Sequence, residues 1–192
     1  MHTRRFAVLI LGIWAGISLA MVFVAIHNFR GVDQLLEAPH AQAGRSVQKL
    51  GPASTRELLR YQVSELNRFY FEWYGIAQIS LALLLALTLL FATRADKIMM
   101  VLSGVLLLVV VFEHKFLTPE ITYLGRLIDF TAPDVPSAPR IRFWSFHKIY
   151  SGMEVFKFAL FLAVALKMVV RGDMRRHAPR HHDVLEGPLE LR

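Results

Sequence analysis

Four ionisable residues lie inside long apolar stretches of this chain. Glu113 and His114 end an apolar run that begins at Ile98, and Glu154 and Lys157 interrupt a second run nearer the C-terminus. Charged side chains in membrane helices normally face other helices or a water-filled cavity, because facing lipid is costly. Carboxyl and imidazole groups can also exchange protons near neutral pH once burial shifts their pKa values. The sequence therefore predicts a polar cluster inside a membrane bundle.

Helix geometry predicts that these residues lie at one depth. At about 1.5 Å per residue, counted from the basic helix ends, all four lie about 21–25 Å from the same membrane surface. That depth is in the outer half of a hydrocarbon core about 30 Å thick. Ser151 shares a helical stripe with Glu154 and joins this layer. An outer rim is expected at about 31–36 Å. The rim residues are His27, Glu72 and His147.

Several chemistries fit these residue types, and they stay open at this point. A structural ion pair would place Lys157 Nζ within about 4 Å of a carboxylate of Glu154 or Glu113. A proton or ion relay would use the same acids and the neighbouring histidine. Haem would need His114 and His147 as axial ligands, which their offset of about 12 Å along the helices opposes. A divalent metal would take imidazole ligands. The candidate metal ligands are His27, His114 and His147.

The elements that must position this cluster are four apolar blocks. The chain has 192 residues, of which 55% are hydrophobic and 19% charged, and it has no cysteine. Each block approaches the roughly 20 residues that a helix needs to cross a bilayer. We therefore predict an all-α integral membrane four-helix bundle, and an ordinary soluble enzyme is excluded. The spans are expected at about 6–26, 71–93, 98–117 and 146–170.

The connections between the spans differ in character. Ser54 to Glu57 fit a capping box, and apolar residues follow at helical spacing. An external amphipathic helix is thus predicted at about 54–70, so that the long second helix extends into the external space. The proline-rich connection after span three is expected to be mostly loop. Residues 1–172 are predicted to form one membrane domain, followed by a flexible cytoplasmic tail at 173–192.

Basic residues predict the orientation. They precede span one, lie between spans two and three, and follow span four, so those three places share the cytoplasmic side. We expect a multi-pass protein of the inner (plasma) membrane with cytoplasmic N and C termini. The net charge of +7 does not indicate nucleic acid, because the basic residues flank apolar blocks. Six tryptophan and tyrosine residues lie in or near the spans, and most of them are expected in the external interfacial belt. These are Trp14, Tyr70, Trp73, Tyr74, Trp144 and Tyr150.

Small residues recur at every fourth position of span one, at Gly12, Gly16 and Ala20. Such a stripe lets another helix approach closely. It favours packing within the bundle, with a dimer as the alternative. The expected partners are therefore the lipid bilayer and either a second copy of the chain or another membrane protein.

Two short motifs carry a family resemblance. One is Thr118-Pro119-Glu120-Ile121 with Arg126 downstream, and the other runs from Phe143 to Ser151 and contains His147. The layout resembles the small membrane-protein family that includes transmembrane protein 205, although Glu154 or Val155 stands near the position where the family has asparagine. The resemblance implies a four-helix membrane protein with a link to resistance or export of toxic compounds. It implies no catalytic residue.

The expected function is a non-enzymatic transport or resistance accessory with the buried polar cluster as its site. No cofactor and no catalytic residue is predicted. One alternative is a membrane redox protein or oxygenase that binds haem or a divalent metal and acts on a lipophilic substrate. Another is a structural or assembly subunit of a membrane complex.

Overall fold

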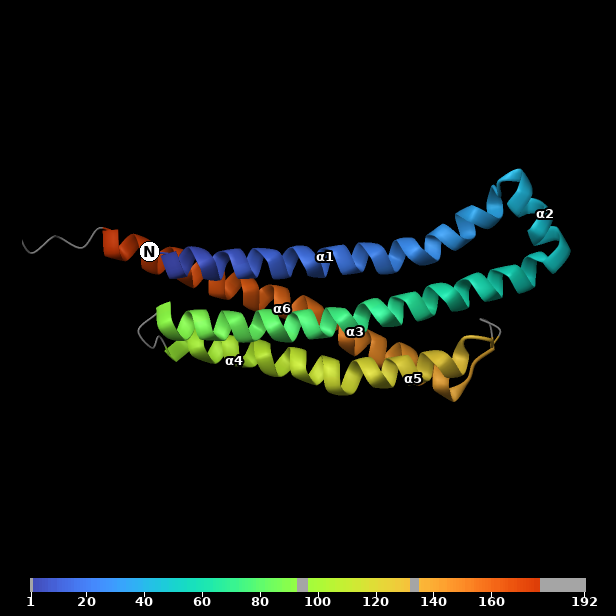
Figure 1. The fold of residues 1–192 in the computed structure, drawn as a ribbon. Helices are drawn as coiled ribbons and strands as arrows, with labels where there is room; N and C mark the ends of the chain where they lie inside the picture. The colour runs from blue at the N-terminus through green and yellow to red at the C-terminus, as the bar shows by residue number, and fades with distance from the viewer. Residues whose placement is uncertain (1, 93–96, 132–134, 177–192) are drawn as a thin grey trace, which may run out of the picture.

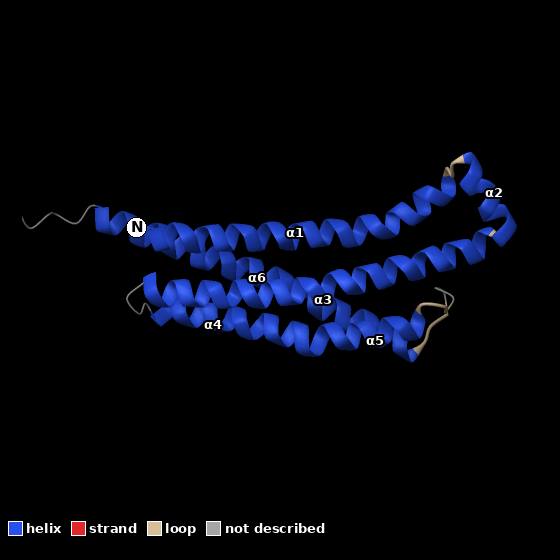
Figure 2. Cartoon of the chain, viewed as in Figure 1, coloured by secondary structure: helices blue, strands red, loops and turns tan. Residues whose placement is uncertain are grey.

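The computed structural model describes residues 2–92, 97–131 and 135–176, and within these ranges the chain is helical, without strands (Figures 1 and 2). The predicted all-α membrane bundle is confirmed, because four helical segments are long and apolar enough to cross a membrane. The elements are α1 (His2–Glu37), α2 (Ala41–Leu50), α3 (Pro52–Ala92), α4 (Lys97–Phe112), the π-helical turn η1 (Glu113–Leu117), α5 (Thr118–Ile128) and α6 (Ala138–Arg176).

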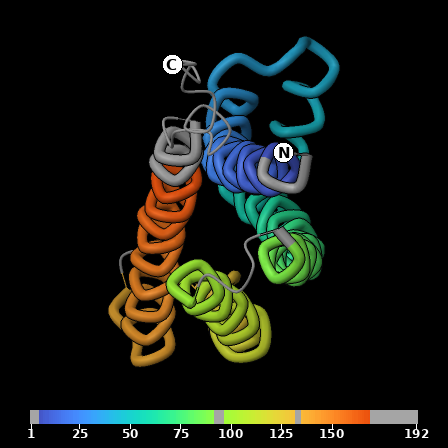
Figure 3. Tube along the Cα trace, turned by 90° about the vertical axis from the view of Figure 1, so that its left-hand side faces the viewer, coloured from blue at the N-terminus to red at the C-terminus, as the bar shows by residue number. Residues whose placement is uncertain are grey.

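The four long segments form a closed ring. Helix α1 packs against α3 and α6, and α4 also packs against α3 and α6, as the view in Figure 3 shows. The start of α1, the end of α3, the start of α4 and the end of α6 lie at one end of the bundle, here called the termini end (Figure 1). The opposite end carries α2 and is called the α2 end. The histidines of the predicted tail, His177, His181 and His182, lie outside the described residues.

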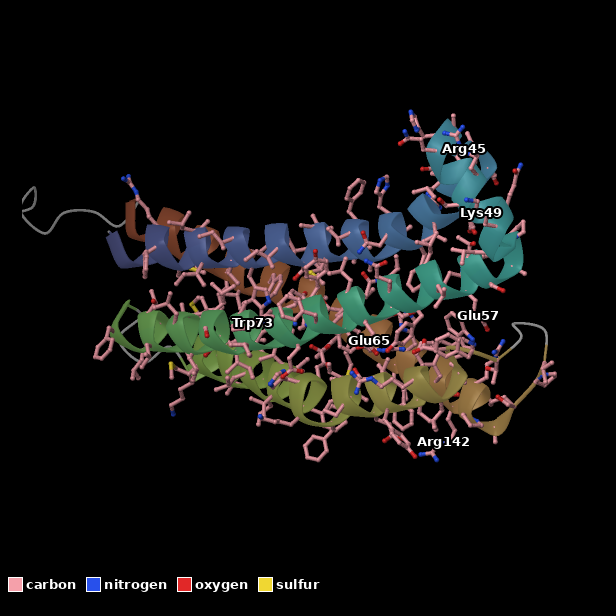
Figure 4. The ribbon with its side chains drawn as sticks, turned by 45° about the vertical axis from the view of Figure 1, so that its right-hand side comes forward. Arg45, Lys49, Glu57, Glu65, Trp73 and Arg142 are labelled. Carbon is pink, nitrogen blue, oxygen red and sulfur yellow. The ribbon has the colours of Figure 1, made fainter. Side chains whose placement is uncertain are left out.

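Helices α1 and α3 project beyond the rest of the bundle at the α2 end. They have 36 and 41 residues, which correspond to about 54 and 61 Å, whereas a bilayer core is about 30 Å thick. Figure 4 shows Arg45 and Lys49 of α2 at the tip of this projection. The predicted long second helix is confirmed, and it has more residues than a single crossing of a bilayer core requires.

The start of α3 differs from the predicted capping box. The helix begins at Pro52, directly after Gly51, whose φ of 85° suits glycine. Proline is favoured at the first helical position, where its missing N–H is not needed. The Thr55 hydroxyl donates to the Gly51 carbonyl at 2.9 Å instead of capping an N–H. Pro52 and Gly51, rather than the Ser54–Glu57 box, therefore set the start of the helix.

The expectation of a mostly irregular connection after span three is wrong. The chain stays helical through Pro119 to Ile128, and α6 begins at Ala138. The π-helical turn explains how Pro119 fits, because the Thr118 N–H bonds to the Glu113 carbonyl five residues back and the helix restarts with proline in its first turn. Pro139 is likewise in the first turn of α6, where the absent N–H costs nothing.

An apolar core fills the half of the bundle nearest the termini end. Its side chains come from all four long segments and are almost completely buried. We call six of them the apolar plug: Leu85, Leu89, Met99, Leu106, Val164 and Met168. Large apolar side chains on the outside of the helices are exposed, as expected for a surface that faces lipid; Leu108, for example, is 71% exposed.

Ionic contacts fasten α3 to α5 toward the α2 end. Arg68 donates to Glu65 at 2.7 Å and to Asp129, at the end of α5, at 2.8 Å. Arg126 of α5 binds both oxygens of Glu65, at 3.0 and 3.1 Å, and Figure 4 marks Glu65 on α3. Such a bidentate guanidinium–carboxylate pair fixes orientation as well as distance. These contacts hold the outer part of α5 in register with α3.

Candidate functional site

Lys157 is the centre of a buried polar cluster. Its side chain is fully buried, and Nζ donates to Glu113 Oε2 at 2.6 Å and to Glu154 Oε1 at 2.8 Å. A third hydrogen bond goes to Gln78 Oε1 at 2.5 Å. We expected Lys157 Nζ to lie within about 4 Å of one acid. In the structure it lies within that distance of both Glu113 and Glu154. Helices α3 and α6 and the turn η1 each supply at least one of these groups.

Neutral side chains of α1 and α3 complete the cluster, and sequence analysis did not find them. The Trp14 indole donates to Gln78 Oε1 at 3.1 Å. The Tyr74 hydroxyl lies 2.7 Å from Ser18 Oγ and donates to Glu154 Oε2 at 3.1 Å. Each helix contributes two residues four positions apart, which is the spacing of one helical face.

The six aromatic residues assigned to the interfacial belt divide into two groups by burial. Trp14, Tyr74 and Tyr150 are buried in the bundle, whereas Trp73 and Trp144 are more than half exposed. The Tyr74 ring also lies 5.7 Å from Lys157 Nζ, within range of a cation–π interaction. Three of the predicted belt residues therefore belong to the interior of the bundle, because their helices turn them inward.

The donors around Lys157 leave one carboxylate oxygen of the cluster without a hydrogen bond among the described residues. An ammonium group has three N–H donors, and all three are used by the acceptors of Gln78, Glu113 and Glu154. With both acids ionised, one positive charge faces two negative charges. Glu113 Oε1 is buried and has no hydrogen-bond partner among the described residues. The cluster can therefore accept one more positive charge, and a proton on a carboxyl group is the smallest that would fit.

The π-helical turn brings two consecutive residues inward. Glu113 and His114 are both buried at the start of η1. Single π-helical turns within α-helices are frequent at functional sites. Here the wider turn lets Glu113 face Lys157 of α6 while His114 packs against α3.

His114 packs closely against α3. Its ring lies against Gly75, where the Cβ of any other residue would overlap the imidazole. His114 Nε2 lies 3.8 Å from Glu72 Oε1, and Nδ1 is buried without a hydrogen-bond partner among the described residues. The Glu72 side chain is 56% exposed. The pair of His114 and Glu72 thus extends from the interior of the bundle to its surface.

Other predicted site residues do not join the cluster. Ser151 is exposed, and its hydroxyl donates to the His147 carbonyl of its own helix at 2.9 Å. The His147 ring stacks on Phe143 at 5.9 Å. His27 is exposed and stacks on Phe23 at 5.4 Å. Glu154 of the predicted α6 stripe therefore contacts Lys157, whereas Ser151 and His147 of the same stripe and the predicted rim residue His27 make other contacts.

The three histidines do not form a metal site in this geometry. Among the residues that the structure describes, no group of three or more His, Asp or Glu side chains is placed to hold a metal ion. His114 lies between α3 and η1, whereas His27 and His147 each contact aromatic rings of their own helices. Within the described residues the arrangement therefore supplies no shared set of three metal ligands.

The small-residue stripe of α1 faces outward, which corrects the favoured expectation of packing within the bundle. Gly12, Gly16 and Ala20 are exposed, and a Cβ at either glycine would meet nothing within 4 Å. The helix instead packs inward through another face, which includes Trp14 and Ser18. A dimer contact through the stripe stays a prediction.

The fold and the buried cluster define a small multi-pass α-helical membrane protein. The chain belongs to the family described as Domain of unknown function (DUF4149), whose model matches residues 9–126, more than half of its length. The match includes Glu113 and His114 and ends before α6, which carries Glu154 and Lys157. No curated protein and no solved structure was found to match the chain. The narrower resemblance to transmembrane protein 205 stays a prediction.

Proposed function

We propose that this protein is a transport or resistance accessory of the inner membrane, with cytoplasmic termini, and that its buried cluster binds and releases a proton. The observation that supports this is Lys157, fully buried between Glu113 and Glu154. A buried charge without a partner costs several kcal/mol, and one acid would suffice to balance the lysine. The second acid therefore lowers stability unless it holds a proton for part of the time, and such a cost is typical of functional sites.

Proton binding is tested by replacing Glu113 with glutamine. The purified protein in lipid nanodiscs is stepped from high to low pH, and infrared difference spectra record protonation of carboxyl groups. We expect a carboxyl band in the wild type that E113Q removes, because Lys157 and Glu154 then form a balanced pair. We also expect E113Q to be at least as stable as the wild type, since the amide oxygen still accepts from Lys157.

The matched control is E120Q, which alters an exposed acid paired with Arg142 at 2.9 Å. It should leave the band in place. A wild-type spectrum without any band that depends on Glu113 would refute proton binding at the cluster. The accessory role is tested in cells that lack the gene: the wild type should restore tolerance to a toxic lipophilic cation, and E113Q should not.

Orientation is tested with a reporter enzyme that is active only outside the cytoplasm. Fusion after residue 50, at the end of α2, should give an active reporter, and fusion after residue 180 should give an inactive one. The physical reason is the concentration of basic residues at the termini end, which favours the cytoplasmic side. Activity of the second fusion alone would reverse the proposed orientation.

A further inference from the structure

Among the residues that the structure describes, polar groups connect the buried cluster to the α2 end of the bundle and not to the termini end. We propose that protons reach it from the α2 end through Glu72 and His114, and that the apolar plug closes the route from the termini end. This inference rests on the proposed proton binding at Glu113. It goes further by assigning the route and the side of access.

The termini end offers no polar path in the described part of the chain. The apolar plug fills the space between the cluster and this end. Phe161 lies one turn beyond Lys157, and its ring centroid is 4.7 Å from that of Trp14, with the two rings tilted by 54°. The buried hydroxyls on this side, Thr88 and Ser103, donate to carbonyls of their own helices at 2.7 and 3.0 Å. Lys167 is about 15 Å farther along α6 than Lys157.

Toward the α2 end, a series of ionisable groups leads from an exposed side chain to the buried cluster. Glu72 is more than half exposed, and His114 Nε2 lies 3.8 Å from its carboxylate. His114 Nδ1 and Glu113 Oε1, on consecutive residues, are both buried, and neither has a hydrogen-bond partner within the described ranges. Beyond Glu113 lies Lys157, bonded in turn to Glu154. Two buried polar atoms that lack partners are unusual in a folded protein and call for an explanation. A proton relay that uses both atoms explains why neither is hydrogen-bonded in the described part of the chain.

The proton balance of this relay is simple. A neutral imidazole carries one proton, and it can accept a second at Nε2 from the Glu72 side while it releases the first from Nδ1. The released proton binds the Glu113 carboxylate, directly or through one bridging water molecule, and the formal charge of the Glu113, Glu154 and Lys157 group changes from −1 to 0. Release is the reverse of uptake: Glu113 returns its proton to Nδ1 while Nε2 gives one proton to the Glu72 side, and the starting state is restored.

The proposal predicts slow but complete protonation when the relay is cut. After a pH step, the Glu113-dependent infrared band should reach its full amplitude in H114Q and E72Q but should appear about 100-fold more slowly, the lower end of the range typical of a lost proton-transfer group. S103A, on the termini side, should match the wild type. E72Q changes an exposed side chain and should fold even if H114Q does not.

The outcomes separate the two proposals. Wild-type rates in both E72Q and H114Q, with the band present, would overturn the route and leave proton binding intact. Slowing in S103A equal to that in E72Q would overturn the one-sided access. Absence of the Glu113-dependent band in the wild type would refute the proposed function itself. Slower protonation of Glu113 in E72Q and H114Q, with a wild-type rate in S103A, supports the route.

Discussion

Replacing Lys157 with methionine should lower the free energy of unfolding by about 3–5 kcal/mol, the usual cost of breaking a buried ion pair. The substitution keeps the length of the side chain but leaves Glu113 and Glu154 buried without their common partner. It also removes the donor to Gln78, which keeps only the Trp14 indole. Thermal or denaturant unfolding of the detergent-solubilised protein measures the loss.

The compensated variant makes this result specific to charge. Replacing Lys157 by methionine together with E113Q and E154Q removes all three charges, so most of the stability should return. K148M, which alters an exposed lysine on the same helix, should stay within about 0.5 kcal/mol of the wild type. If the triple variant were as unstable as K157M, the lysine would have a role other than balancing the two acids.

The charged part of the cluster could be predicted from the sequence because charge is rare in a membrane span. The fixed rise of a helix then placed Glu113, Glu154 and Lys157 at one depth, and the structure brings these three together. Gln78 and Ser18 carry no charge, and neutral polar residues occur in many spans without a shared role. Their contribution depends on how α1 is aligned against α3, and a single sequence does not specify that alignment.

The prediction of a loop after span three failed because of a local feature of the backbone. Proline is usually a sign of loop, but the π-helical turn before Pro119 keeps the chain helical. The same turn buries both Glu113 and His114, which ordinary helical spacing would place 100° apart. For His27 and His147, depth alone could be estimated from sequence, and depth does not tell which helix a ring contacts.

Gly75 should be the glycine least tolerant of alanine in the bundle. A Cβ at this position would overlap the His114 ring, whose own attachment to η1 leaves little room to retreat. Alanine is favoured over glycine in a helix by about 1 kcal/mol, but overpacking costs about 1–3 kcal/mol. We therefore expect G75A to lower stability on balance, and also to slow protonation of Glu113 because His114 moves away from Glu72.

G104A is the matched control, since a Cβ at Gly104 of α4 would meet nothing within 4 Å. It should be neutral or slightly stabilising, with an unchanged rate of protonation, in the same unfolding and infrared measurements. Double replacement of Gly75 by alanine and His114 by alanine should recover the stability lost in G75A, because the smaller side chain leaves room for the added methyl group, but it should not recover the rate. Equal stability of G75A and G104A would contradict the close packing of His114 against α3. Recovery of the rate in the double variant would instead show that the imidazole takes no part in proton transfer.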